Sequence, residues 1–316
     1  MKKLSLLKLA IISGACAVAS TVLRIVSLLG FTDASGYYES HPIPMIANLV
    51  FGLSLLFVGA AAMFFIKKNE SVDIPNKTAG IAALLPIGAL AFHAISQFIA
   101  TTENGLTHLN TNKSFAEKLV ERIPFFTIIF AALSIVFFVL ISVIAFKKKP
   151  ITAIAYVGLI PLIYVILLWA STHFDFLITL NSANKTFFFV ACASALLFIY
   201  NEIAACCKLM LRSKFYYFSL FAAIITLSTA SIPSVIAYLS GSLGRYFSLE
   251  GDLFFITVLI YATVRLITLI IEQRKAPAIE EESETSKNDT ADASKEESED
   301  LGEKANESSE KSEEKS

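Results

Sequence analysis

The sequence is poor in the residues that form common catalytic, metal and disulfide sites. Its 316 residues include only four cysteines, four histidines and one tryptophan. The cysteines (Cys16, Cys192, Cys206 and Cys207) are not spaced as a disulfide framework or as a paired CxxC metal site. The motifs GxxxxGKS/T, GxGxxG, HExxH and GxSxG do not occur. We therefore expect no enzyme activity, no cofactor and no metal.

Two further kinds of site are also unsupported by the sequence. No basic patch with interleaved aromatic residues occurs, so we expect no nucleic acid as a partner. Aspartyl chemistry would need two acidic residues on the same side of the membrane. Asp175 and Asp252 are the one pair that the sequence offers. We place both at the membrane surface rather than within a span, so we do not assign them a catalytic role.

Long apolar runs are what the chain has in abundance. Hydrophobic residues make up 55% of it, and they are concentrated in runs without the alternation of a barrel strand. A bilayer core about 30 Å thick requires roughly 20 apolar residues per helix. The sequence therefore predicts an all-α, polytopic membrane helix bundle with eight transmembrane helices. The expected spans are 6–29, 44–66, 79–101, 124–146, 150–170, 186–207, 215–239 and 253–272.

The N-terminus also has features of a signal peptide. Lys2 and Lys3 form a basic start, and Ala15-Cys16-Ala17 resembles a cleavage site. However, the apolar run continues to Leu29, which is too long for the apolar region of a signal peptide. We expect an uncleaved first helix.

Basic residues alternate between the gaps that separate the spans. One set of gaps carries 14 of them: Lys2, Lys3, Lys8, Lys67, Lys68, Lys77, Lys147, Lys148, Lys149, Lys208, Arg212, Lys214, Arg274 and Lys275. The other set carries five: Lys113, Lys118, Arg122, Lys185 and Arg245. Because loops rich in lysine and arginine stay in the cytoplasm, the sequence predicts a multi-pass protein of the cell membrane with both termini cytoplasmic.

The last part of the chain has a different composition. Residues 276–316 contain 15 acidic and 5 basic residues, against 27 and 26 in the whole chain. A segment so poor in large apolar residues cannot bury enough surface to offset the entropy of ordering it. We therefore expect a transmembrane domain at 1–275 and a disordered, acidic cytoplasmic tail at 276–316. The tail is either a solvated extension or a contact for a cytoplasmic protein partner.

Two parts of the chain resemble each other. Residues 109–115 (LNTNKSF) and 180–187 (LNSANKTF) are similar, with one residue inserted in the second. A basic cluster and a span with a proline, Pro86 or Pro161, precede each of them. The sequence therefore suggests a parallel repeat, 67–146 and 147–208; chance similarity of short segments is the alternative.

Two charges lie well inside predicted spans. Glu202 and Arg265 are each about two turns or less from the cytoplasmic end of a span, so they lie at similar depth. A charge inside a bilayer costs about 2.5–3.5 kcal/mol on insertion scales. We therefore expect a buried ion pair, with Asn201 and Tyr261 nearby. It serves either as structural support or as a coupling or gating pair.

A second group of polar residues lies toward the opposite ends of the spans. His93 and Gln97 are four residues apart and share one helix face. If the first, second, third and fifth spans adjoin, these side chains line an outward-facing polar cavity; otherwise they are ordinary polar residues at helix ends. The predicted outer polar cluster comprises Arg24, Asn48, His93, Gln97, His173 and Asp175.

Two short motifs carry a resemblance to known proteins. Asp33-Ala34-Ser35-Gly36-Tyr37-Tyr38 follows the first span, and an NS-x-NK element ends at Lys185. Together they resemble those of a group of polytopic membrane proteins of anaerobic Gram-positive bacteria. The resemblance implies a bacterial, eight-helix protein and excludes the tail. It implies no activity, and no catalytic or binding residue transfers with it.

Two functional classes remain open from the sequence. The first is a transporter or permease-like protein for a small solute, which enters by the outer polar cluster while Glu202 and Arg265 form an inner latch. The second is a membrane-embedded sensor, scaffold or accessory subunit without transport activity, which contacts a partner through its tail.

Overall fold

The computed structural model describes residues 6–32, 37–66, 72–103, 115–174, 183–208, 213–241 and 249–273. Within these ranges the chain is helical without β-strands, and eight helical segments are long and apolar enough to cross a membrane. The predicted all-α fold with eight spans is therefore confirmed. The predicted acidic tail, 276–316, lies outside the described residues.

The helices follow the predicted spans, but two spans are divided into a short and a long helix. The elements are α1 Leu6–Gly30, α2 Pro42–Phe65, α3 Lys77–Ala82, α4 Leu85–Glu103, α5 Phe115–Lys147, α6 Ile154–Val157, α7 Leu159–His173, α8 Ala183–Cys206, α9 Ser213–Leu239 and an unlabelled last helix, Leu249–Gln273, here called the final span. One compact unit extends to Thr268. A second begins at Leu269, and only its first residues, the end of the final span, are described.

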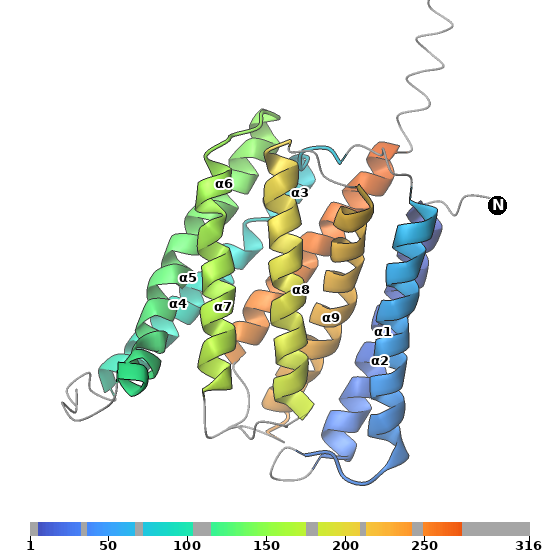
Figure 1. Cartoon of the computed structure of the whole chain (residues 1–316), viewed down its shortest axis with the longest axis vertical. Coiled ribbons are helices and arrows are strands. Elements are labelled where there is room, and N and C mark those ends of the chain that lie inside the picture. Colours follow the sequence, from blue (N-terminus) through green and yellow to red (C-terminus); the bar gives the residue numbers. More distant parts are fainter. Residues whose placement is uncertain are drawn as a thin grey trace, which may run out of the picture. The chain divides into compact units, whose positions relative to one another are not determined.

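Two of the spans are interrupted next to a proline. The third span breaks between α3 and α4, just before Pro86, and the fifth breaks at Gly158, just before Pro161. A proline ring clashes with the carbonyl four residues earlier and donates no hydrogen bond, and these carbonyls belong to Ala82 and Val157, the last residues of α3 and α6. Figure 1 shows both short helices at the same end of the bundle. The similar breaks support the repeat, which stays a prediction because most of the matching loops lies outside the described residues.

The two ends of the bundle differ in basic residues. We call the end where α1, α3, α6 and α9 begin the lysine-rich end, because Lys8, Lys77, Lys147, Lys208 and Lys214 lie there. The opposite end, where α2, α5 and α8 begin, is the lysine-poor end.

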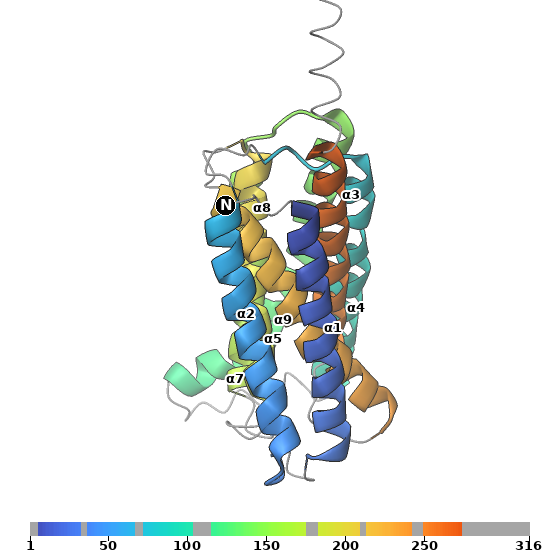
Figure 2. The ribbon, with the colours of Figure 1, turned by 90° about the vertical axis from the view of Figure 1, so that its right-hand side faces the viewer.

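The two most buried spans are α9 and α8, and the final span packs against α8. Of the eight spans, α9 has the largest buried share, and it contacts α1, α2 and α8. The final span contacts α5 and α7 through Phe254 and α8 through Phe255. In Figure 2, α1 and α2 lie side by side, and α1 turns its small residues Ser13 and Ala17 inward.

Many of the large side chains on the outside of the bundle are apolar. Met45, Phe64 and Leu239 are each at least 75% exposed. Such a surface is unfavourable in water but matches the hydrocarbon of a bilayer, in which the backbone of a helix is satisfied internally. The chain is therefore an integral membrane protein by its surface as well as by the length of its helices.

We expect the contact between α3 and α5 to be sensitive to one added methyl group. A Cβ atom built at Gly80 would lie 2.6 Å from Cβ of Ala145 and 3.4 Å from the carbonyl oxygen of Ser142. Neither neighbour can move without the backbone of α5, so Gly80→Ala should lower the free energy of unfolding by about 1–3 kcal/mol. Thermal unfolding in detergent measures this. Gly88→Ala is the matched control: nothing lies within 4 Å of its added Cβ, and it should be neutral or slightly stabilising because alanine favours helix.

Candidate functional site

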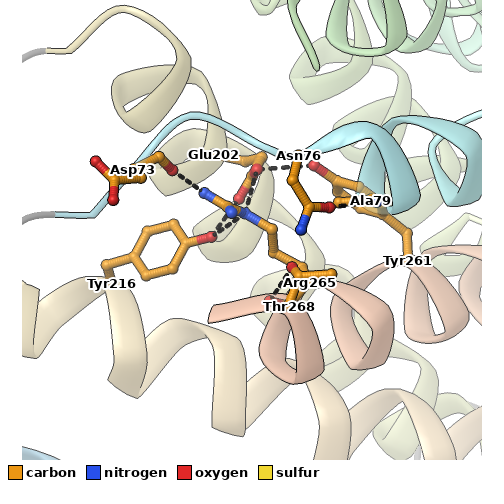
Figure 3. A network of polar contacts seen from close by, with 8 residues as sticks. All are labelled: Asp73, Asn76, Ala79, Glu202, Tyr216, Tyr261, Arg265 and Thr268. Atoms are coloured by element: carbon orange, nitrogen blue, oxygen red, sulfur yellow. Dashed lines mark hydrogen bonds and ion pairs between the residues drawn. The ribbon is translucent and has the colours of Figure 1, made fainter. Parts of the chain in front are cut away.

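The structure places Glu202 and Arg265 in direct contact near the lysine-rich end. Glu202 lies four residues before the end of α8, and Arg265 lies in the final span. Nε of Arg265 is 3.1 Å from Oε1 of Glu202, and both side chains are at most 1% exposed. Glu202 and Arg265 thus form a buried salt bridge (Figure 3).

Two tyrosines complete the surroundings of the Glu202 carboxylate. Tyr261, one turn before Arg265, donates to Oε1 at 2.7 Å, and Tyr216 of α9 donates to Oε2 at 2.6 Å. The Tyr216 hydroxyl also accepts from Nε of Arg265 at 3.0 Å. Each carboxylate oxygen therefore has a strong donor, which is what makes a buried charge tolerable.

The segment that leads into α3 closes the other side of Arg265. Nη2 of Arg265 donates to the carbonyl oxygen of Asp73. Asn76 caps α3 by accepting from the backbone N–H of Ala79 at 3.0 Å, which holds this segment in place. The guanidinium therefore connects three parts of the fold: the final span, α8 and the start of the third span. We call this group (Asp73, Glu202, Tyr216, Tyr261 and Arg265) the latch.

Asn201 was expected near this pair but is not part of the latch. Its Nδ2 donates to the carbonyl oxygen of Leu197 in its own helix at 2.8 Å. Neighbours in sequence project about 100° apart around a helix, so Asn201 and Glu202 face different sides of α8.

A second buried charge, Arg24, lies toward the lysine-poor end of α1. It is fully buried, and none of its three guanidinium nitrogens has a hydrogen-bond partner. The guanidinium carbon lies 3.9 Å from the ring centroid of Phe187 in α8 and 5.5 Å from that of Tyr38. Aromatic faces stabilise the charge of a guanidinium but do not replace acceptors for its N–H groups.

The carboxylate within electrostatic range of Arg24 is Asp252, in the first turn of the final span. Asp252 is 2% exposed, and the two side chains do not form a salt bridge. The hydroxyls of Ser231 and Ser234 of α9 lie next to its carboxyl. Oδ1 of Asp252 and the Ser231 hydroxyl are nevertheless without a hydrogen-bond partner. We call Arg24, Asp252, Ser231, Ser234 and Tyr38 the Arg24 centre.

A third polar group surrounds His93 in α4. Nδ1 of this buried histidine is 3.2 Å from the hydroxyl of Tyr164 in α7. One turn later along α4, the Ser96 hydroxyl donates to Oε1 of Glu250 at 2.9 Å. These contacts join α4 to α7 and to the start of the final span, so His93 is a hydrogen-bonded packing residue in this structure.

The predicted outer cluster is not gathered around one cavity. The side chains of Asn48 and His173 are exposed, Gln97 is half-buried, and Asp175 lies outside the described residues. Among the described helices, α1 and α2 pack on each other and on α9, whereas α4 packs on α5, and α7 on α5 and α8. The first two spans are therefore separated from the third and fifth, and the adjacency on which the cavity depended is not found.

The sequence interpretation missed the importance of Asp252. The predicted final span began at residue 253, whereas the described helix already includes Leu249 to Asp252, so Asp252 was placed at the surface. The useful signal was the Ser231 and Ser234 pair around Pro233, which supplies polar groups inside an otherwise apolar α9. Lys185 was also counted as a loop charge, but it is buried and donates to the carbonyl oxygen of His173 at 3.0 Å.

The described residues contain no group of three or more histidines, cysteines or acidic residues that could hold a metal ion. Comparison with protein-family models, with curated proteins and with solved structures finds no match. The resemblance to polytopic proteins of anaerobic Gram-positive bacteria therefore stays a prediction. The class that the fold defines is a multi-pass helical membrane protein with two buried charge centres.

Proposed function

We propose that this protein is a transporter for a small solute, with the Arg24 centre as its solute site and the latch as a gate near the lysine-rich end. The observation that carries this proposal is the state of Arg24. A buried arginine without an acceptor is costly, and charges inside membrane spans commonly mark solute or ion pathways. The latch, in contrast, is nearly fully hydrogen-bonded, as expected of a closed contact.

The orientation of the protein is part of the proposal. The distribution of 14 and 5 basic residues supports a cell-membrane protein whose lysine-rich end faces the cytoplasm. The latch would then close the pathway on the cytoplasmic side, and Arg24 would lie nearer the outside. Alternating access requires a pathway that can be closed on either side of the site, and the latch would supply the closure between the Arg24 centre and the cytoplasm.

Flux through proteoliposomes tests the proposal with a broad mixture of candidate solutes. Liposomes with the purified protein are loaded with isotope-labelled amino acids, carboxylates, sugars, nucleosides and amines, and loss of each is followed by mass spectrometry. We expect at least one solute to leave faster than from protein-free liposomes. Glu202→Gln should reduce that flux to background, because it removes the charge that holds Arg265 in the latch.

The second candidate is a sensor, scaffold or accessory subunit, favoured by the acidic composition of 276–316. Deleting residues 280–316 separates the two functions. Under the transport proposal, the flux is unchanged by this deletion. If instead no solute of the mixture leaves and the deletion releases a co-purifying cytoplasmic protein, the scaffold function holds.

A further inference from the structure

We infer that the Arg24 centre binds a small zwitterion, with a carboxylate group on Arg24 and an ammonium group on Asp252. This inference rests on the proposed function, because it identifies the class of solute that the centre would take. It depends on three observations: which edge of Arg24 is free, what surrounds Asp252, and how the charges of the centre balance.

The free edge of Arg24 matches a carboxylate. The guanidinium carbon lies over the ring of Phe187, 3.9 Å from its centroid, and none of the three guanidinium nitrogens has an acceptor. A planar fork of unpartnered donors favours a planar acceptor that takes two parallel hydrogen bonds. The unpartnered hydroxyl of Tyr38, whose ring also faces the guanidinium, is one more donor for such a group.

Asp252 offers the complementary half of the site. Its Oδ1 accepts no hydrogen bond, and the neighbouring Ser231 hydroxyl is also without a partner. Oδ1 of Asn184 in α8 accepts a hydrogen bond from the Ser234 hydroxyl at 2.8 Å. This bond connects α8 to the Arg24 centre. A carboxylate and hydroxyl oxygens together suit an ammonium group, which carries three N–H donors and no acceptor.

The charge balance excludes solutes with one charge as good ligands. A solute with only a carboxylate would add negative charge close to Asp252 and to Glu250, which lies two residues before Asp252 in the final span. An amine alone would add positive charge close to Arg24. At low dielectric both additions are unfavourable. A zwitterion adds no net charge and supplies a partner to each of two groups that do not reach each other.

The test is the thermal stability of the purified full-length protein with matched probes at equal concentration. The zwitterions are alanine, β-alanine and γ-aminobutyrate, which differ in the separation of their charges; propionate and ethylamine each carry one charge. We expect at least one zwitterion to raise Tm by about 3 °C or more near saturation, and propionate and ethylamine to have a much smaller effect. Arg24→Met and Asp252→Asn should each abolish the shift.

A matched control and the opposing outcomes complete the test. Thr102→Val changes an exposed hydroxyl that bonds to its own helix, and it should keep the shift. Equal stabilisation by propionate and alanine, or no shift with any zwitterion, overturns the inference. If the solute mixture then shows an Arg24-dependent flux of another class, the transport proposal still stands. If a zwitterion stabilises the protein but no solute leaves the liposomes, the binding site stands and transport fails.

Discussion

Replacing Glu202 with leucine is expected to lower the free energy of unfolding by about 3–5 kcal/mol. The replacement leaves the Arg265 charge buried with no carboxylate, and it leaves the hydroxyls of Tyr216 and Tyr261 without their acceptor. Unfolding of the protein in detergent, by heat or by denaturant, measures the change. Because the latch joins α8, α9 and the final span, the loss should appear in the main transition.

Two further variants separate charge from packing. In the double variant Glu202→Leu with Arg265→Met, no buried charge is left without a partner, and most of the lost stability should return. Tyr261→Phe removes one hydrogen bond to the carboxylate and should cost about 1.5–3 kcal/mol. A Glu202→Leu protein within about 1 kcal/mol of the wild type would show that the salt bridge contributes little.

Replacing Arg24 with methionine and Asp252 with asparagine together should have the opposite effect on stability and a larger one on function. Neither charge forms a salt bridge in the wild type, and Arg24 has no hydrogen bond, so their removal relieves a desolvation cost. We expect a free energy of unfolding equal to or above that of the wild type, by up to about 2 kcal/mol. The solute flux should fall to that of protein-free liposomes.

The combination of the two readouts makes this prediction specific. A protein whose functional site is energetically unfavourable commonly becomes more stable when the residues of that site are replaced. Loss of flux with unchanged or raised Tm therefore marks a solute site. Destabilisation by more than about 2 kcal/mol would instead assign Arg24 and Asp252 a structural role, like that of the latch.

The two centres differed in how far the sequence could predict them. Glu202 and Arg265 were paired from depth alone, since each is the one charge well inside its span and both lie at similar distances from the lysine-rich end. Depth also predicted that Tyr261, one helical turn from Arg265, would be close. Depth did not show that the Asn201 amide bonds to Leu197 in its own helix rather than to the pair, because the direction in which a side chain leaves its helix depends on how the helix is rotated toward its neighbours.

The residues of the predicted outer polar cluster show that depth does not predict which side chains are buried or lie together. Arg24 and Asn48 are at comparable depth, yet Arg24 is buried and Asn48 is exposed. His93 was grouped with them, but it lies on α4, which packs against α5 rather than against α1 or α2. The predicted start of the final span, at residue 253, left Asp252 outside the span and so removed it from consideration.

The membrane class, the eight spans, the end of the bundle at which each helix begins, and the depths of Arg24, Glu202 and Arg265 could all be predicted from the sequence. These properties follow from the length and apolar character of each segment, because the bilayer imposes the same thickness on every helix. Which helices adjoin, and which face of each helix turns inward, became clear from the packing of the folded chain. Within a bilayer, apolar side chains are equally tolerated on both faces, so small differences in packing and in hydrogen bonding set the arrangement. That arrangement brings Glu202 and Arg265 into contact and leaves Arg24 buried without an acceptor.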